Sequence, residues 1–269
     1  MIGQERLRIV AIEARGLIPR VPEGCPWQPS PLNLSVPCHA VVGMVGPNGN
    51  GKTTWMRLLG GVDDPAQGDL TLLGRDVWTL EEFEWQGLRQ EVGFILSHTP
   101  LLSVVNGLVN VTLPALYHQM GTPAMIEERA RKLIDRLGWS GDLTLLPGFM
   151  SELQRRVLAL ARCLILNPRV LFIDEPFVPL DNAARTQLER HLIRLVREEG
   201  LTLVASSHNL SFVRRHADII LFAHSTGLKI FGSWDQFSAD PDPEIQIFLH
   251  PELPEATAGA GHFDQDRPR

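Results

Sequence analysis

The pattern of apolar and polar positions predicts a mainly parallel β-sheet with helices on both faces. Short apolar runs typical of buried strands lie at residues 40–45, 92–96, 170–173, 202–206 and 218–223, and two further strands are expected at 7–13 and 69–73. Helices are expected to begin near Lys52, to span 183–199 and to lie near 210–216. Because strands and helices alternate along the chain, the predicted fold class is α/β.

The middle of the chain changes character and is predicted to be mainly helical. Within residues 125–137, five apolar side chains would share one face of a helix: Ile126, Ala130, Leu133, Ile134 and Leu137. We therefore expect one domain over residues 1–250 with a helical subdomain at about 98–165. Five prolines predict an irregular loop at 19–31, and a stretch rich in Pro, Gly, Ala and Asp predicts a disordered tail at 251–269.

The composition is that of a folded protein with an acidic balance. Hydrophobic residues make up 44% and charged residues 21% of the 269 residues, and the formal net charge is -6. Proteins that bind nucleic acid are usually basic, so no nucleic-acid partner is expected. No apolar segment approaches the roughly 20 residues that span a bilayer. The expected location is therefore cytoplasmic, with any membrane process reached by docking on another chain.

The three cysteines lie far apart and suggest neither a zinc site nor a disulfide framework: Cys25, Cys38 and Cys163. Isolated thiols of this kind fit a reducing compartment. Cys163 sits in the apolar run LALARCLIL, where we expect a small buried thiol.

A glycine-rich turn, GPNGNGKT, follows the predicted strand 40–45 and matches the pattern G-x-x-x-x-G-K-[ST] in full. Its glycines let the main chain approach a phosphate, and the amides at the following helix start form an anion nest. Lys52 would place its charge on the β- and γ-phosphates, and the Thr53 hydroxyl is suited to bind Mg²⁺. The turn and its flanks predict a nucleoside triphosphate site rather than a plain connection. Its residues are Gly46, Pro47, Asn48, Gly49, Asn50, Gly51, Lys52, Thr53 and Thr54.

Two carboxylates follow the apolar run 170–173. Asp174 at the strand end can hold Mg²⁺ through water, and Glu175 is placed to polarise an attacking water molecule. Acidic residues often end strands, so this motif would be weak alone. Paired with the phosphate loop upstream, it indicates a hydrolytic site.

These motifs resemble those of the ABC ATPase family over about residues 5–250. The resemblance also rests on Asp181, on Ser207–His208 after a strand, and on the helix beginning near Ser151. It implies a P-loop NTPase fold with a mainly parallel sheet core, an N-terminal antiparallel β part and a helical subdomain. It further implies ATP and Mg²⁺ as cofactors and ATP hydrolysis coupled to transport, with Glu175, His208 and Lys52 as the catalytic residues.

Within this resemblance, His208 occupies the position that contacts the γ-phosphate. Asp181 would lie at the seam between two ATPase subunits. It equally suits a helix cap before NAARTQLERHL, and the two roles are compatible. Ser151 would contact the nucleotide held by the second subunit.

The chain departs from the family pattern at two places. Ser97 stands where the family has a Mg²⁺-sensing glutamine, and it is too short to span the same distance; the neighbouring His98 is an alternative ligand. The signature segment Met150–Gln154 keeps Ser151 and Gln154 but has Glu152 and Leu153 in place of two glycines. Side chains there would hinder approach to a γ-phosphate, and a carboxylate would repel it. The pattern suits an asymmetric pair of ATPase subunits or a homodimer with slow turnover.

The resemblance also bears on partners and cargo. Three short segments resemble the Mla-type lipid-transport ATPases within this family: Ile173–Asp181, Asn110–His118 and Asp240–Leu249. This implies a permease, a second ATPase subunit and lipid-binding partner proteins, with the chain peripheral at the inner face of the membrane. Residues 101–116 would receive a coupling helix of the permease. Trp27 is expected either to stack on adenine or simply to pack in its loop. The alternative function is a nucleotide-sensing subunit with little ATPase activity.

Overall fold

A six-stranded sheet forms the centre of the chain in this computed structural model, which describes residues 10–25, 27–96 and 101–250. Its strand order is β10–β9–β3–β8–β7–β6. All neighbours from β9 to β6 are parallel, and only β10 is antiparallel. The strands are β3 (Val41–Val45), β6 (Val92–Ile95), β7 (Val170–Ile173), β8 (Thr202–Ser206), β9 (Ile219–His224) and β10 (Gly227–Phe231).

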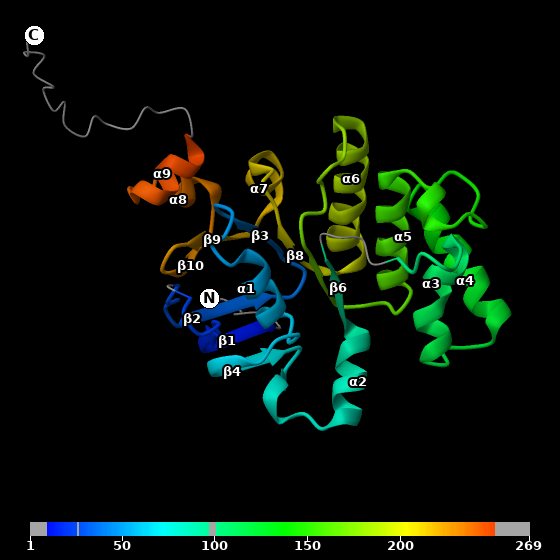
Figure 1. The fold of residues 1–269 in the computed structure, drawn as a ribbon, viewed down its shortest axis with the longest axis horizontal. Coiled ribbons are helices and arrows are strands. Elements are labelled where there is room, and N and C mark those ends of the chain that lie inside the picture. The colour runs from blue at the N-terminus through cyan, green and yellow to red at the C-terminus, as the bar shows by residue number, and fades with distance from the viewer. Residues whose placement is uncertain (1–9, 26, 97–100, 251–269) are drawn as a thin grey trace, which may run out of the picture.

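A second, antiparallel sheet has the order β2–β1–β4–β5 and lies at the lower left of Figure 1. Its strands are β1 (Val10–Pro19), β2 (Leu32–Pro37), β4 (Pro65–Leu72) and β5 (Arg75–Asp76). This sheet is the antiparallel β part that the resemblance implied. β1 runs past the predicted end at residue 13 because pairing with β4 continues to Pro19 and Pro65. The predicted strand residues 7–9 lie outside the described part.

The helices next to the central sheet agree with the predictions from sequence. They are α1 (Lys52–Leu59), α6 (Asn182–Glu199) and α7 (Leu210–His216). The Asp181 side chain accepts a hydrogen bond from Ala184 N (2.8 Å), which confirms its role as the cap of α6. The sequence pattern missed β2, β5, β10, α2 (Glu82–Glu91), α8 (Trp234–Ser238) and α9 (Pro243–Leu249).

Three helices gather on one side of the molecule, at the right of Figure 1: α3 (Gly107–Tyr117), α4 (Pro123–Arg136) and α5 (Glu152–Leu164). The five apolar residues expected on one face of α4 and its end are all buried. None of the described helices is both long and apolar enough to cross a membrane.

The core strands are buried on both faces, as the continuous apolar runs predicted. In β7, Val170 and Phe172 join one apolar cluster, whereas Leu171 and Ile173 join the other. This alternation follows from side chains pointing to opposite faces of a strand. Because β3, β7 and β8 are parallel, the polar residues that follow them emerge at the same edge of the sheet.

Candidate nucleotide-binding site

The phosphate loop joins β3 to α1, and its glycines have conformations that other residues rarely adopt. Gly46 has φ +141°, and a Cβ there would lie 2.7 Å from the carbonyl oxygen of Ala223. Gly51 has φ +75°, and a Cβ there would lie 2.5 Å from the ring of Trp27. Glycine is therefore required at both positions by backbone conformation and by close packing.

Lys52 is held against the main chain of the same loop. The residue is 8% exposed, and its Nζ donates to the carbonyl oxygens of Gly46 (2.9 Å) and Pro47 (3.0 Å). Burial lowers the pKa of Lys52, while the charges of Glu175 and Asp174 act in the opposite direction. The cation thus lies inside the loop, facing the two carboxylates predicted to share the site.

Asp174 links the loop to the end of β7. Thr53 Oγ1 donates to Asp174 Oδ2 at 3.1 Å, although the two residues are 121 positions apart in the sequence. The Ser206 hydroxyl, at the end of β8, donates to the other oxygen, Oδ1. A hydroxyl next to a buried carboxylate provides the hard oxygen ligands that Mg²⁺ prefers, so the residues fit this ion. Ser206 was not predicted, because one serine at a strand end gives no sequence signal.

Glu175 and His208 meet on the same edge. His208 Nε2 lies 3.2 Å from Glu175 Oε1, and His208 N donates to Oε2 at 3.4 Å. Glu175 has φ +47°, an uncommon conformation for a non-glycine residue, and its N–H donates to Ser206 Oγ at 3.0 Å. Ser206 therefore fixes both carboxylate residues, and the geometry brings together every residue predicted as catalytic.

The signature segment is organised as a helix cap. Ser151 Oγ accepts a hydrogen bond from Gln154 N (3.2 Å), and the Gln154 side chain accepts one from Ser151 N (2.8 Å). Such a capping box satisfies the first amides of α5 within the chain itself. Ser151 is thus placed on the helical side of the molecule, as the cap of α5.

Glu152 does not carry an isolated charge. Its carboxylate pairs with Arg155 and lies 3.0 Å from Arg156 Nε. The nearly buried Arg156 also donates to the carbonyl oxygens of Glu175 (3.1 Å) and Val178. The sequence did not predict this link from the signature segment to the main chain of Glu175.

Trp27 packs against the phosphate loop and against Trp55 of α1. Its ring stands edge-on to Trp55, with centroids 6.4 Å apart, and covers Gly51. A separate cavity of about 330 Å³ adjoins Thr54, the last residue of the loop; it is lined by Pro19, Arg20, Thr54, Leu58, Val62, Asp63 and Asp64. The other predicted ligands, Ser97 and His98, lie outside the described residues.

Comparison with known proteins agrees with this fold. The ABC transporter family model matches residues 30–178, more than half of the chain. The chain therefore belongs to the ABC transporter family, and its fold is that of the family's ATP-binding domain. The Mla-type subgroup is not distinguished by this match.

Individual relatives support the assignment. The chain is 30% identical over 224 residues to the methionine import ATP-binding protein MetN of Xylella fastidiosa, covering 83% of this chain and 64% of the relative. It is 34% identical over 192 residues to the macrolide export ATP-binding/permease protein MacB of Rhodopirellula baltica, covering 71% of this chain and 28% of that protein. The chain thus spans less than two thirds of either relative.

A solved structure shows the same fold. The dimeric post-hydrolysis state of the ATP-binding cassette MJ0796 bound to ADP and Pi superimposes with a TM-score of 0.75 at 22% identity. The match covers 82% of this chain and 98% of that one.

Proposed function

We propose that this chain binds ATP with Mg²⁺, hydrolyses it, and uses the cycle to drive a membrane permease. One observation carries the proposal. Three separate segments meet around the buried Lys52. They contribute Thr53 in the first turn of α1, Asp174 with Glu175 after β7, and His208 after β8. In the proposal, these residues act as metal ligands, general base and phosphate-binding cation at one edge of the sheet.

Each residue has a separate task in this proposal. The loop amides and Lys52 bind the phosphates, and Thr53 with Asp174 would hold Mg²⁺, which withdraws charge from the phosphates when bound. Glu175 orients the attacking water and accepts its proton. His208 contacts the γ-phosphate and, through its contact with Glu175, fixes the direction of that carboxylate.

The cavity beside Thr54 offers space for the nucleoside. It begins at the end of the phosphate loop and is bordered by Pro19, the last residue of β1, and by Arg20. Trp27 already packs on Gly51 and Trp55, so stacking on adenine would require its ring to leave that contact. We therefore place the base in the cavity and assign Trp27 to packing.

The surface for the permease is the exposed face of α3. Val104 (82% exposed) and Tyr117 (76% exposed) are its most open members. This α3 patch consists of Val104, Val109, Leu113, Leu116, Tyr117 and Met120. Its members within α3, from Val109 to Tyr117, recur at helical spacing and are exposed to solvent in the part of the chain that the structure describes. A coupling helix of a permease is the proposed occupant, which would hold this chain at the inner face of the membrane.

A second ATPase subunit is part of the proposal. The two would close with nucleotide between them, either as a homodimer with slow turnover or as an asymmetric pair whose partner supplies an intact signature. A phospholipid or other lipid as cargo, with lipid-binding partner proteins, stays a prediction from the short sequence resemblances. The relatives above are named for methionine import and macrolide export.

The proposal is tested by phosphate release from the purified chain, alone and with its permease. Glu175→Gln should lower the Mg²⁺-dependent rate by about 100-fold or more while ATP stays bound. Glu198→Gln, on the exposed face of α6, is the matched control and should keep the unmodified rate. Equal rates in the two variants would contradict the proposed role of Glu175.

The rival function is a nucleotide-sensing subunit with little ATPase activity, which Ser97 and the altered signature residues Glu152 and Leu153 favour. For such a subunit, the unmodified chain would bind ATP without turnover above buffer, and Glu175→Gln would change little. The contact between Glu175 and His208 favours hydrolysis.

A further inference from the structure

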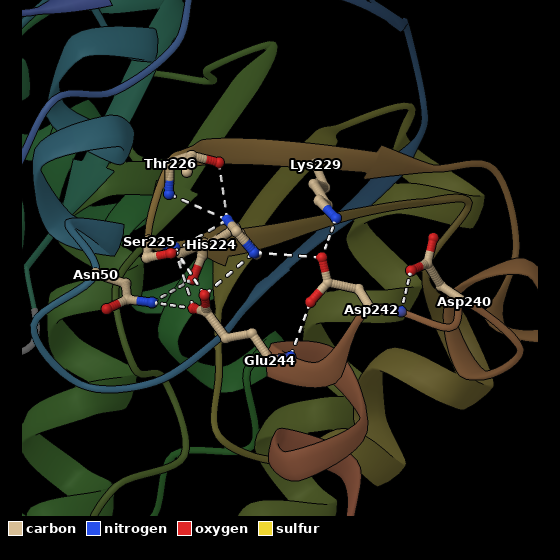
Figure 2. A network of polar contacts seen from close by, with 9 residues as sticks. Asn50, His224, Ser225, Thr226, Lys229, Asp240, Asp242 and Glu244 are labelled. Atoms are coloured by element: carbon tan, nitrogen blue, oxygen red, sulfur yellow. Dashed lines mark hydrogen bonds and ion pairs between the residues drawn. The ribbon is translucent and has the colours of Figure 1, made fainter.

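The phosphate loop has a polar contact with the C-terminal helix that no ABC motif accounts for. Asn50 Nδ2 donates to Glu244 Oε1 at 2.6 Å and to the carbonyl oxygen of Ala223 at 2.9 Å. Asn50 is the fifth residue of the loop, and Glu244 lies 194 positions later, in the first turn of α9. Figure 2 shows Asn50 and Glu244 pointing toward each other beneath the β9–β10 turn.

Glu244 is itself held firmly. Ser225 N donates to both of its oxygens, at 3.0 and 3.2 Å, and His224 Nε2 lies 3.1 Å from Oε2. His224 Nδ1 accepts the N–H of Thr226 at 3.0 Å, so Nε2 carries the proton that faces the carboxylates. The orientation of Glu244 is therefore set by the end of β9 as well as by Asn50.

Helix α9 is anchored independently of this contact. Asp242 caps the helix by accepting from Glu244 N at 2.8 Å, and Lys229 pairs with Asp242. Ile245 is fully buried, and Phe248 packs on Phe222 with centroids 5.5 Å apart. A carboxylate near a triphosphate is electrostatically unfavourable unless donors compensate it, and here three donors surround it.

We propose that Glu244 is a positioning residue for nucleotide binding. Through Asn50 it fixes the phosphate loop in the conformation whose amides face the phosphates, which couples α9 to the nucleotide site. Gly46 supports this coupling because it also packs on Ala223, so both halves of the loop rest on the end of β9. The inference rests on the proposed function, since it concerns the affinity of the same site for ATP.

The experiment compares the dissociation constant of mant-ATP with Mg²⁺ across variants of the full chain. Glu244→Ala and Asn50→Ala should each weaken binding of mant-ATP by roughly 5- to 10-fold. The double variant should lose little more affinity than either single variant, because both changes remove the same contact. Glu244→Gln keeps an acceptor for Asn50 and should recover most of the affinity. In ATP hydrolysis, the Glu244→Ala change should appear in KM with little change in kcat.

The matched control is Gln246→Ala on the same helix. Gln246 Nε2 donates to the carbonyl oxygens of Ser238 (3.3 Å) and Asp240 (2.7 Å), so it anchors α9 without touching Asn50. This variant should lower the melting temperature as much as Glu244→Ala does, yet keep the affinity for mant-ATP. An equal loss of affinity in both variants would overturn the proposal, because loosening of α9 would then explain it.

Linkage supplies a second readout that does not depend on a variant. If α9 and the loop are coupled, ATP binding must slow amide hydrogen exchange in α9 of the unmodified chain. Unchanged exchange in α9, or unchanged affinity in Glu244→Ala, overturns the inference alone. Failure of the unmodified chain to bind mant-ATP would instead contradict the proposed function.

Discussion

The phosphate loop and the signature segment both end at a helix N-terminus, but the two helix ends are used differently. Among the described residues, no side chain caps α1, and its first turn contains no acidic residue. At α5, Ser151 and Gln154 form a capping box, and Glu152 stands in the first turn. The first amides of a helix lack partners within the helix, so α1 offers them to an anion, whereas α5 satisfies them internally.

The charges around the two helix ends differ in the same way. Lys52 lies inside the phosphate loop opposite Asp174 and Glu175, where a bound nucleotide and metal ion would complete the balance of charge. Glu152 is already balanced by Arg155 and Arg156. Repulsion by Glu152 is therefore smaller than its charge alone predicts, because that charge is compensated within the chain.

The largest expected effect is on the phosphate loop. Lys52→Ala removes the cation that faces the carboxylates and should weaken ATP binding by about 100-fold or more. Titration with mant-ATP measures the change. Lys132→Ala, which removes an exposed cation paired with Glu128 on α4, is the control and should leave affinity unchanged.

Arg156→Met tests the link between the signature segment and Glu175. The side chain is nearly buried and donates to two carbonyl oxygens, so its loss should lower the free energy of unfolding by about 2–3 kcal/mol. Hydrolysis should fall as well, because the main chain of Glu175 loses a donor. Urea denaturation and phosphate release are the measurements.

Arg155→Met gives the matched comparison for that prediction. Arg155 pairs with the same carboxylate but is more exposed, so its removal should lower the free energy of unfolding by about 1 kcal/mol or less. Arg155 also donates to the carbonyl oxygen of Met150 (2.7 Å), so the two variants differ mainly in burial and in the contact with Glu175. An equal loss of unfolding free energy in the two variants would contradict the larger contribution expected of the buried Arg156.

Thr53→Val tests the metal ligands of the phosphate-loop side. The variant loses the hydroxyl that donates to Asp174 and should raise the Mg²⁺ concentration needed for half-maximal hydrolysis by about 10-fold, or ~1.4 kcal/mol. Thr53→Ser keeps a hydroxyl and should need about the same Mg²⁺ concentration as the unmodified chain. A metal requirement that is the same in all three proteins would remove Thr53 from the metal site.

The smallest effect is expected at the signature segment. Glu152→Gln removes a charge that two arginines already offset, so hydrolysis should rise by only about 2- to 3-fold. Glu128→Gln on α4 is the control, and phosphate release by the purified chain is the measurement. Brisk hydrolysis by the unmodified chain alone would defeat the interpretation of a weak signature.

Local patterns in the sequence were sufficient for most of the elements around the site. Three elements have the predicted bounds: the strands at 170–173 and 202–206 and the helix at 210–216. Asp181 also caps its helix as expected. These features depend on burial of a continuous apolar run, or on a hydrogen bond between near neighbours, so a short window of sequence contains the cause. β2 and α9 contain local signals that are short, namely the alternation of Leu32, Leu34 and Val36 and the cap by Asp242, and their burial depends on the sheet or helix beside them. β10 has no comparable pattern, because only its end residues Gly227 and Phe231 are buried.

The sequence by itself determined the phosphate loop and the acidic pair, because glycine conformation and the chemistry of Lys52, Asp174 and Glu175 are properties of those residues. Only the tertiary structure decided which distant groups meet them. Four contacts are of this kind: the hydrogen bonds of Ser206 to Asp174, of Arg156 to the carbonyl of Glu175 and of Asn50 to Glu244, and the packing of Trp27 against Gly51. They arise from strand order and helix packing, which bring together residues far apart in the chain and leave no periodic signal in the sequence.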